Sequence, residues 1–180
     1  MRDALADMPL IAAGGIADRR GWVAALALGA DGAAFGTRFL ASEEAAAHPL
    51  YKQRIVNARA DDTIHTTLFD IGWPDAPHRV LRTEVVDEWE RAGRPASGNR
   101  PGEGVPVVTI RRPDIEVPVV NYTVMPPTDF TEGEIERLAL YAGQSCSLIK
   151  EILPAGEIVR RIAAEATNLV ADRLGRLVRE

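Results

Sequence analysis

Two glycine turns, separated by one predicted helix, constrain the fold of this chain more than any other feature. The first turn, Gly14-Gly15, follows the apolar residues Leu10 to Ala13. The second, Gly36-Thr37, follows Ala33 to Phe35. Each apolar run is typical of a short buried strand, and glycine lets the backbone turn tightly and bring its N–H groups close to an anion. The pair predicts two strand ends that face one phosphate group.

The residues between the two turns favour one strand–helix–strand unit. Asp18 is placed to cap the helix, and Gly29 stands where a left-handed C-cap is expected. The apolar residues repeat at helical spacing: Trp22, Val23, Ala25 and Leu26. The whole unit has about the ~30 residues expected of a βαβ motif. In a (β/α)₈ barrel, the loops after strands 7 and 8 and a short extra helix form a standard phosphate site. Residues 38–47 are predicted to supply that helix.

A glycine pair by itself is more often a strand-to-helix turn that binds no ligand. The second strand and its Gly-Thr ending favour a ligand-binding turn instead, because both strand ends then point the same way. We therefore expect a ligand site here.

Several segments resemble the C-terminal half of the nitronate monooxygenase family, formerly called 2-nitropropane dioxygenases. Near the N-terminus these are Ile11–Ala17, Ala27–Gly32 and Phe35–Leu40. Farther along, Leu140–Ser145, Leu148-Ile149 and a closing helix from Ala155 to about Leu169 are similar to the end of those flavoproteins. The resemblance is weakest between residues 58 and 127.

This resemblance implies an FMN-dependent TIM barrel in which the flavin phosphate lies between the two turns. The FMN-binding candidates by that match are Gly14, Gly15, Ala34, Phe35, Gly36 and Thr37, with Gly143, Gln144 and Ser145 as weaker ones. The alternative for the last three is a helix C-terminus followed by a polar turn. Arg38 would add a positive charge if it turned inward, but a solvated arginine is the expectation.

The predicted fold class is α/β: the C-terminal part of an FMN-binding TIM (β/α)₈ barrel with an appended, mostly helical domain. A barrel needs roughly 200–250 residues, and this chain has 180. We expect residues 1–48 to be the last two βα units, residues 49–130 a helical and irregular insert, and residues 131–180 helices that return to the barrel. Six strands would then precede Met1.

We expect no catalytic residue and no metal site within this chain. The family's catalytic histidine belongs to the expected missing part. His48, His65 and His78 lack a second histidine or carboxylate at metal-ligand spacing, so structural or solvent-exposed roles are expected for them.

Composition excludes some partners. A formal net charge of −5 with scattered arginines argues against a nucleic-acid or anionic-membrane surface. The single cysteine, Cys146, excludes an internal disulfide, suits a reducing cytosol and is expected to be a small packed residue. No signal peptide or apolar run of ~18 residues is present, so a cytoplasmic location is expected.

The remaining segments carry weaker signals. We predict helices at 49–58 and 80–91, a strand at 64–69, edge strands at 107–110 and 116–120, and a final helix at 155–169. The letters Thr131-Glu-Gly-Glu134 match a capping box that would open another helix. Trp73, in a loop rich in glycine and proline, is expected to be a core plug rather than a lid over a pocket.

Three functions stay open on these grounds. The first is FMN-dependent oxidation of alkyl nitronates by oxygen, in a truncated or split chain. The second keeps the flavin but resembles flavin-dependent enoyl-acyl-carrier-protein reductases. The third is a non-catalytic remnant or interaction module, which unpaired strand edges would favour. The expected partners are a small nitronate substrate and a chain that supplies the rest of the barrel.

Overall fold

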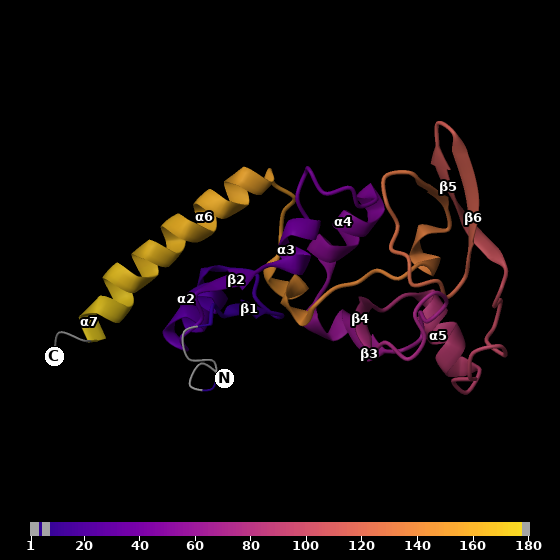
Figure 1. Cartoon of the computed structure of the whole chain (residues 1–180), viewed down its shortest axis with the longest axis horizontal. Helices are drawn as coiled ribbons and strands as arrows, with labels where there is room; N and C mark the ends of the chain where they lie inside the picture. The colour runs from indigo at the N-terminus through magenta and orange to yellow at the C-terminus, as the bar shows by residue number, and fades with distance from the viewer. Residues whose placement is uncertain (1–3, 5–7, 178–180) are drawn as a thin grey trace.

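The computed structural model of the chain describes residue 4 and residues 8–177, and it has an elongated shape (Figure 1). A long C-terminal helical rod and the N-terminal βαβ unit lie at one end. Helices α3 (Gly36–Leu40) and α4 (Pro49–Asn57) occupy the middle. An antiparallel sheet lies at the other end. Within the described ranges, no helix is long and apolar enough to cross a membrane.

The predicted strand–helix–strand unit is confirmed, but its two strands are exposed or half-buried and not buried as expected. Strand β1 (Ile11–Ala13) pairs in parallel with β2 (Gly32–Ala34), and Ala13 lies opposite Ala34. Helix α2 (Arg19–Ala27) begins where the Asp18 side chain accepts hydrogen bonds from the next backbone amides. Gly29 has φ +90°, as the expected left-handed C-cap requires. No further strand pairs with this two-stranded sheet in the described residues.

Helices α3 and α4 follow the second strand closely. Helix α3 starts at Gly36 and ends at Leu40, so it begins earlier and is shorter than the predicted helix at 38–47. Helix α4 matches its prediction because His48 caps it and Pro49 occupies the first turn. Tyr51 and Ile55 form its buried face.

The prediction of a helix at 80–91 is wrong in its first part. His78–Leu81 form strand β4, which pairs antiparallel with β3 (Thr63–Thr66), and helix α5 (Glu84–Arg91) begins only after Thr83. Val80 and Leu81 continue the helical spacing of α5, which is why periodicity extended the helix too far. Backbone pairing with β3 decided the outcome.

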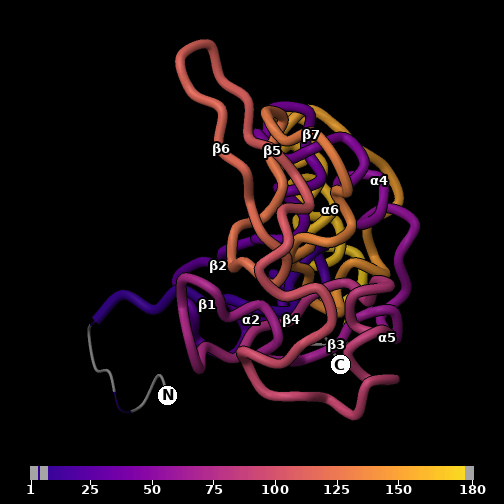
Figure 2. The backbone as a smooth tube through the Cα atoms, turned by 90° about the vertical axis from the view of Figure 1, so that its right-hand side faces the viewer, coloured from indigo at the N-terminus to yellow at the C-terminus, as the bar shows by residue number. Residues whose placement is uncertain are grey.

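The two edge strands predicted near residues 107 and 116 are confirmed as one hairpin. Strands β5 (Pro106–Arg112) and β6 (Ile115–Val120) pair antiparallel, and the hairpin projects from the body of the molecule (Figure 2). With β3 and β4, this puts four strands between residues 49 and 130, so the predicted mostly helical segment holds more strand than expected. The boundaries at residues 48 and 130 stay predictions.

The capping-box prediction at Thr131 is wrong. Residues Thr131–Gly133 form strand β7 on the free edge of β5. Thr131 Oγ1 accepts a hydrogen bond from the amide of Thr128, which precedes it by three residues, and not from an amide that follows it. The amide of Glu134 donates to Val107 O. At Gly133, with φ +120°, a Cβ would lie 2.8 Å from Val107 O. Sheet pairing therefore overrode a local helix signal.

The C-terminal part contains short turns and then a long helix. Two 3₁₀ turns, Ile135–Arg137 and Gln144–Leu148, flank an extended segment. Helix α6 (Ala155–Asn168) confirms the predicted last helix, and it continues through a π-helical stretch (Leu169–Leu174) into α7 (Gly175–Leu177). Figure 1 shows these three as one rod beside α2, to which α6 packs.

Three hydrophobic clusters make up the core. One surrounds Tyr51 and Ile55, a second surrounds Phe69 and Val85, and a third lies between the β5–β6 hairpin and Leu138. Trp73 belongs to none of them. Its exposed fraction is 66%, so the expected core plug is wrong. The Gly72 turn leaves the indole on the surface.

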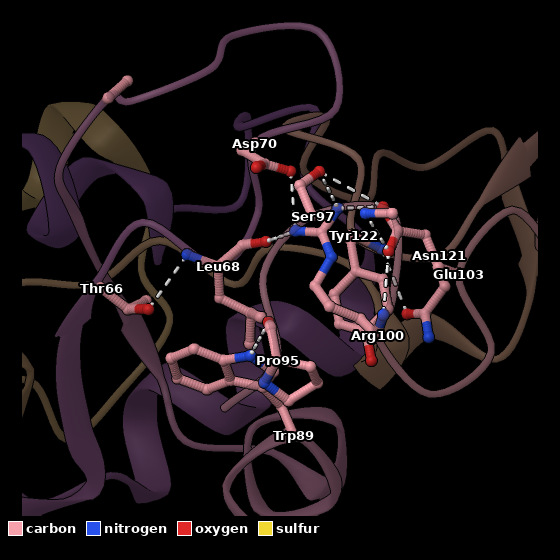
Figure 3. Close-up of polar contacts among 12 residues, drawn as sticks. Thr66, Leu68, Asp70, Trp89, Pro95, Ser97, Arg100, Glu103, Asn121 and Tyr122 are labelled. Atoms are coloured by element: carbon pink, nitrogen blue, oxygen red, sulfur yellow. Dashed lines mark hydrogen bonds and ion pairs between the residues drawn. The ribbon is translucent and has the colours of Figure 1, made fainter. Parts of the chain in front are cut away.

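A buried arginine organises the loop between α5 and β5 (Figure 3). The Arg100 side chain is 2% exposed and forms ion pairs with Asp70 and Glu103. It also donates to Leu68 O, and its guanidinium lies 4.4 Å from the ring centroid of Tyr122. One side chain thus joins the 93–105 loop to the β3–β4 connection.

Removing this guanidinium should strongly destabilise the chain. We expect Arg100→Met to lower the free energy of unfolding by about 2–4 kcal/mol, because Asp70 and Glu103 lose their shared cation. Urea denaturation measures the change. Arg91→Met, which removes an exposed partner of Glu84, is the control and should change it by less than about 0.5 kcal/mol. Equal effects of the two variants would contradict this role for Arg100.

The same cluster predicts an acid transition. The hydrogen bond from Arg100 outweighs desolvation and, with the amides of Gly98 and Arg100, lowers the pKa of Glu103 from 4.5 to about 2. A lowered folded-state pKa stabilises the fold above the unfolded pKa, and this stability is lost as pH falls from about 4.5 towards 2. We expect a loss on the order of 2–3 kcal/mol from this group, read from urea midpoints at each pH. Glu103→Gln should flatten that part of the curve; an unchanged slope would refute the assignment.

Candidate functional site

The two predicted glycine turns lie side by side at one edge of the β1–β2 sheet. Ala13 pairs with Ala34, so Gly14-Gly15 and Phe35-Gly36 directly follow a paired position on neighbouring parallel strands. Neighbouring strands lie about 4.8 Å apart. The structure therefore places both turns at the carboxyl ends of adjacent strands, the position at which open α/β sheets and barrels bind ligands.

The backbone at these turns is accessible. Gly14 and Gly15 have φ of +91° and +72°, which side chains other than glycine rarely adopt. A Cβ built on Gly14, Gly15 or Gly36 would meet no atom within 4 Å. Open space beside two adjacent strand ends leaves room for a bound group against the main chain, as a phosphate cradle requires.

Thr37 joins this edge to the third predicted segment. Its Oγ1 accepts a hydrogen bond from the Gly143 amide at 3.0 Å, across 106 positions of sequence. A Cβ on Gly143 would lie 3.6 Å from that oxygen and 3.5 Å from Ser145 Oγ. The structure thus brings Thr37 and Gly143 together; Ser145 is buried beside them and Gln144 is exposed. An extended chain precedes Gly143, so the helix C-terminus considered as an alternative is absent there.

A cleft of about 370 Å³ opens where these segments meet. Its lining is mostly apolar and is contributed by α3, α4, β4 and the segments near residues 126 and 142. The lining residues are Gly36, Thr37, Leu40, Tyr51, Arg79, Pro126, Tyr141, Ala142 and Gly143. Ligand sites typically have this character, an apolar concavity with a few polar groups.

The hydroxyls of the two tyrosines that line the cleft donate hydrogen bonds to backbone carbonyls. Tyr51 donates to Tyr141 O at 2.5 Å, and Tyr141 donates to Val124 O at 2.7 Å. Burial raises the pKa of both phenols. Both therefore stay protonated and act as positioning donors, so neither is suited to take a proton.

Arg38 differs from its predicted solvated position. It is buried and donates from Nη2 to Ala41 O and Glu151 O, at 2.8 and 2.7 Å. Desolvation lowers the pKa of its guanidinium. These two bonds anchor α3 to the segment before α6, and neither of them is made to the glycine turns.

Two histidines and the cysteine make contacts within the fold. His48 caps α4 through Nδ1, and His78 Nδ1 lies 2.8 Å from Ala76 O. Cys146 is fully buried, as expected, and burial raises the pKa of its thiol. Among the residues that the structure describes, no three His, Cys, Asp or Glu side chains are grouped so as to hold a metal ion.

Sequence reasoning missed the three polar side chains of the cleft other than Thr37, namely Tyr51, Arg79 and Tyr141. Tyr51 fell within the predicted helix at 49–58, with no role in a site. Arg79 immediately preceded the predicted helix at 80–91, whereas in the structure it lies in strand β4. The antiparallel bridge between Val80 and Tyr141, which brings these residues together, joins segments far apart in the chain and leaves no local signal.

Several of the matches to known proteins carry one family description. A family model described as nitronate monooxygenase matches residues 1–165. Nitronate monooxygenase npaC of Metarhizium robertsii is 32% identical over 179 residues, which cover 94% of this chain and 44% of that protein.

Solved structures agree with this match. FabK from Thermotoga maritima has a TM-score of 0.61 at 33% identity, covering 94% of this chain and 48% of that one. Nitroalkane oxidase from Streptomyces ansochromogenes has a TM-score of 0.62 at 30% identity, covering 93% and 41%. The chain thus spans about half, or less, of the length of the relatives it matches.

The contact between Thr37 and Gly143 gives a test of the site's assembly. Thr37→Val should remove the acceptor and destabilise the chain by about 1–2 kcal/mol, since a partly buried amide loses its partner. Thr37→Ser keeps the oxygen and is the matched control. Amide hydrogen exchange at Gly143 should quicken in Thr37→Val and not in Thr37→Ser. Equal exchange rates in both variants would show that this hydrogen bond does not hold the loop.

Proposed function

The chain belongs to the nitronate monooxygenase family, and from that premise we propose that its two strand-end turns hold the phosphate of FMN in a flavin-dependent oxidation of alkyl nitronates. The proposed phosphate ligands are the amides of Gly14, Gly15, Gly36 and Thr37. Ala34 and Phe35 would contribute backbone next to them. In this proposal the two strands belong to a (β/α)₈ barrel.

One observation carries this proposal. Two glycine turns, each with open space at its Cα, follow a paired position on adjacent parallel strands. Backbone amides gathered in this way attract phosphate oxygens because each supplies a donor, and the three glycines among them bring no competing side chain. The residues present therefore fit the phosphate group of a flavin.

The chain's own residues would bind and orient the cofactor. A bound flavin supplies the electron-accepting chemistry, and the protein supplies placement and polarity. Thr37 fixes Gly143 through its hydroxyl oxygen, and Gly143 directly precedes the 3₁₀ turn that contains Gln144 and Ser145. The apolar walls from Leu40 and Pro126 would keep water from the bound ligand. The proton-accepting residue is proposed to lie outside these residues.

A second candidate keeps the same anchor. The likeness to FabK of Thermotoga maritima favours a flavin-dependent enoyl-acyl-carrier-protein reductase-like function. That function needs a nicotinamide cofactor as reductant, so oxidation of added NADH or NADPH would separate it from oxygen-dependent nitronate oxidation.

The exposed faces of the βαβ unit favour a partner surface. Ile11 and Leu28 are 57% and 82% exposed, and both edges of the β1–β2 sheet lack a neighbour among the described residues. Unpaired parallel strands with apolar faces are normally covered. The proposed cover is further βα units of the same barrel, and a non-catalytic interaction module remains the third candidate.

Flavin titration tests the anchor directly. FMN added to the purified chain should show an altered visible band and slowed release on dilution. Gly15→Asp should weaken FMN binding by more than about tenfold, or ~1.4 kcal/mol, because it places a carboxylate against the phosphate.

Gly104→Asp is the matched control, since Gly104 also has positive φ and open space. It should leave FMN affinity unchanged. The same affinity in both variants would refute the anchor, and absence of binding by the folded wild-type chain would refute FMN binding by these residues on their own.

A further inference from the structure

Arg79 is the charged side chain among the residues that line the cleft. It lies in β4, one strand position before Val80, and its carbonyl accepts the Ala142 amide at 3.1 Å. Because Gly143 is in turn bonded to Thr37, the backbone of Arg79 is joined to the same edge as the glycine turn at residue 36, and Arg79 and Gly36 both line the cleft. Its place therefore depends on β4, which periodicity did not predict.

The guanidinium has donors that the described protein does not use. Its Nη1 donates to Thr63 Oγ1 at 3.0 Å and approaches Thr63 O at 3.5 Å. No Asp or Glu within the described ranges forms an ion pair with it. Most arginines there do pair with carboxylates, as Arg82, Arg100 and Arg137 do. A guanidinium carries five N–H donors in a fixed fork, so Arg79 retains Nε and Nη2 for a ligand.

The surroundings of Arg79 in the cleft strengthen the attraction of its positive charge for an anion. Its walls are mostly apolar, and the hydroxyls of Tyr51 and Tyr141 donate their protons to backbone carbonyls. The Thr37 hydroxyl accepts from Gly143 and still has its own proton to donate. In such a setting a charge is less screened than at the surface, so an anion would gain more from it.

We propose that Arg79, with the Thr37 hydroxyl, is the anion-binding group of this cleft and that its ligand is an oxyanion with two or more oxygens. The planar fork of arginine matches such groups with two parallel hydrogen bonds. Two sources share this chemistry under the proposed function, on which the choice of ligand rests: the phosphate of FMN and the nitro oxygens of an alkyl nitronate.

Three variants separate this role from structural ones. Arg79→Gln removes the charge and the fork. Thr63→Val removes the protein partner of Arg79 and keeps the guanidinium, so it measures the structural part of the contact. Arg160→Gln removes one exposed positive charge that pairs with Glu157, and it controls for net charge. Circular dichroism and thermal unfolding identify the variants that fold.

Binding of FMN, riboflavin, inorganic phosphate and propane-2-nitronate is measured for each folded variant, with amide shifts at Gly143 as the site-specific readout. If Arg79 binds the flavin phosphate, Arg79→Gln weakens FMN about tenfold or more and leaves riboflavin unchanged. If it binds the substrate, FMN affinity is kept and nitronate affinity falls by about the same factor. In both cases Thr63→Val and Arg160→Gln retain binding within about threefold.

Unchanged affinity of Arg79→Gln for all four probes would overturn the proposal, as would an equal loss in Thr63→Val. Failure of the wild-type chain to bind any of the three anions would also overturn it. Should the wild-type chain bind phosphate or nitronate through Arg79 but not FMN, the flavin proposal fails and the anion site stands. Arg79→Lys supplies a folded comparison if Arg79→Gln does not fold, and it should lose part of the affinity because it lacks the fork.

Discussion

The structure depends on one extended segment, residues 138–143, that crosses the middle of the molecule. Leu138, Ala139 and Leu140 are all buried, and each packs in a different hydrophobic cluster. The backbone of this segment accepts from Leu81 N at 2.8 Å and from the Tyr51 hydroxyl at 2.5 Å, and it donates from Ala142 to Arg79 O. One short run of chain thereby joins the three clusters and positions α4 and β4. Its last bond, from Gly143 to Thr37, reaches the edge of the β1–β2 sheet. The cleft is a consequence of this crossing, because its walls come from the elements that the segment ties together.

This arrangement explains which features could be predicted from the sequence. The βαβ unit was predictable because its information is local: Asp18 caps, Gly29 ends the helix, and the apolar runs are short. Helices α4 and α6 and the β5–β6 hairpin were predictable for the same reason. The candidate phosphate residues came from the resemblance together with the direction shared by two parallel strands. Their adjacency follows from the register of β1 and β2, while their role stays a prediction.

Several of the failures share one physical cause, which is pairing between segments that are not adjacent in the sequence. Thr131–Gly133 carry a helix-capping pattern, but β5 offers an unpaired edge that takes them as a strand. Val80 and Leu81 fit a helical period equally well as a strand, and β3 decides between them. The solvated position expected of Arg38 failed because two carbonyls, one of them 113 positions away, satisfy its guanidinium. The glycine side of the cleft was anticipated, but its polar side chains were not, because Tyr51, Arg79 and Tyr141 meet only through such pairing.

Net charge proved a weak guide to local electrostatics. The chain carries −5 overall, and this argues against an extended basic surface. Yet the acidic excess is not distributed evenly around the arginines. Carboxylates surround Arg100 and Arg82, whereas Arg38 lies among carbonyls and Arg79 beside a threonine. Where a guanidinium lacks a carboxylate partner and lies against apolar walls, a small region of positive potential persists in an acidic protein. Composition therefore predicts only whether an extended charged partner surface is expected, while the hydrogen-bond partners of single arginines indicate where a small anion is proposed to bind.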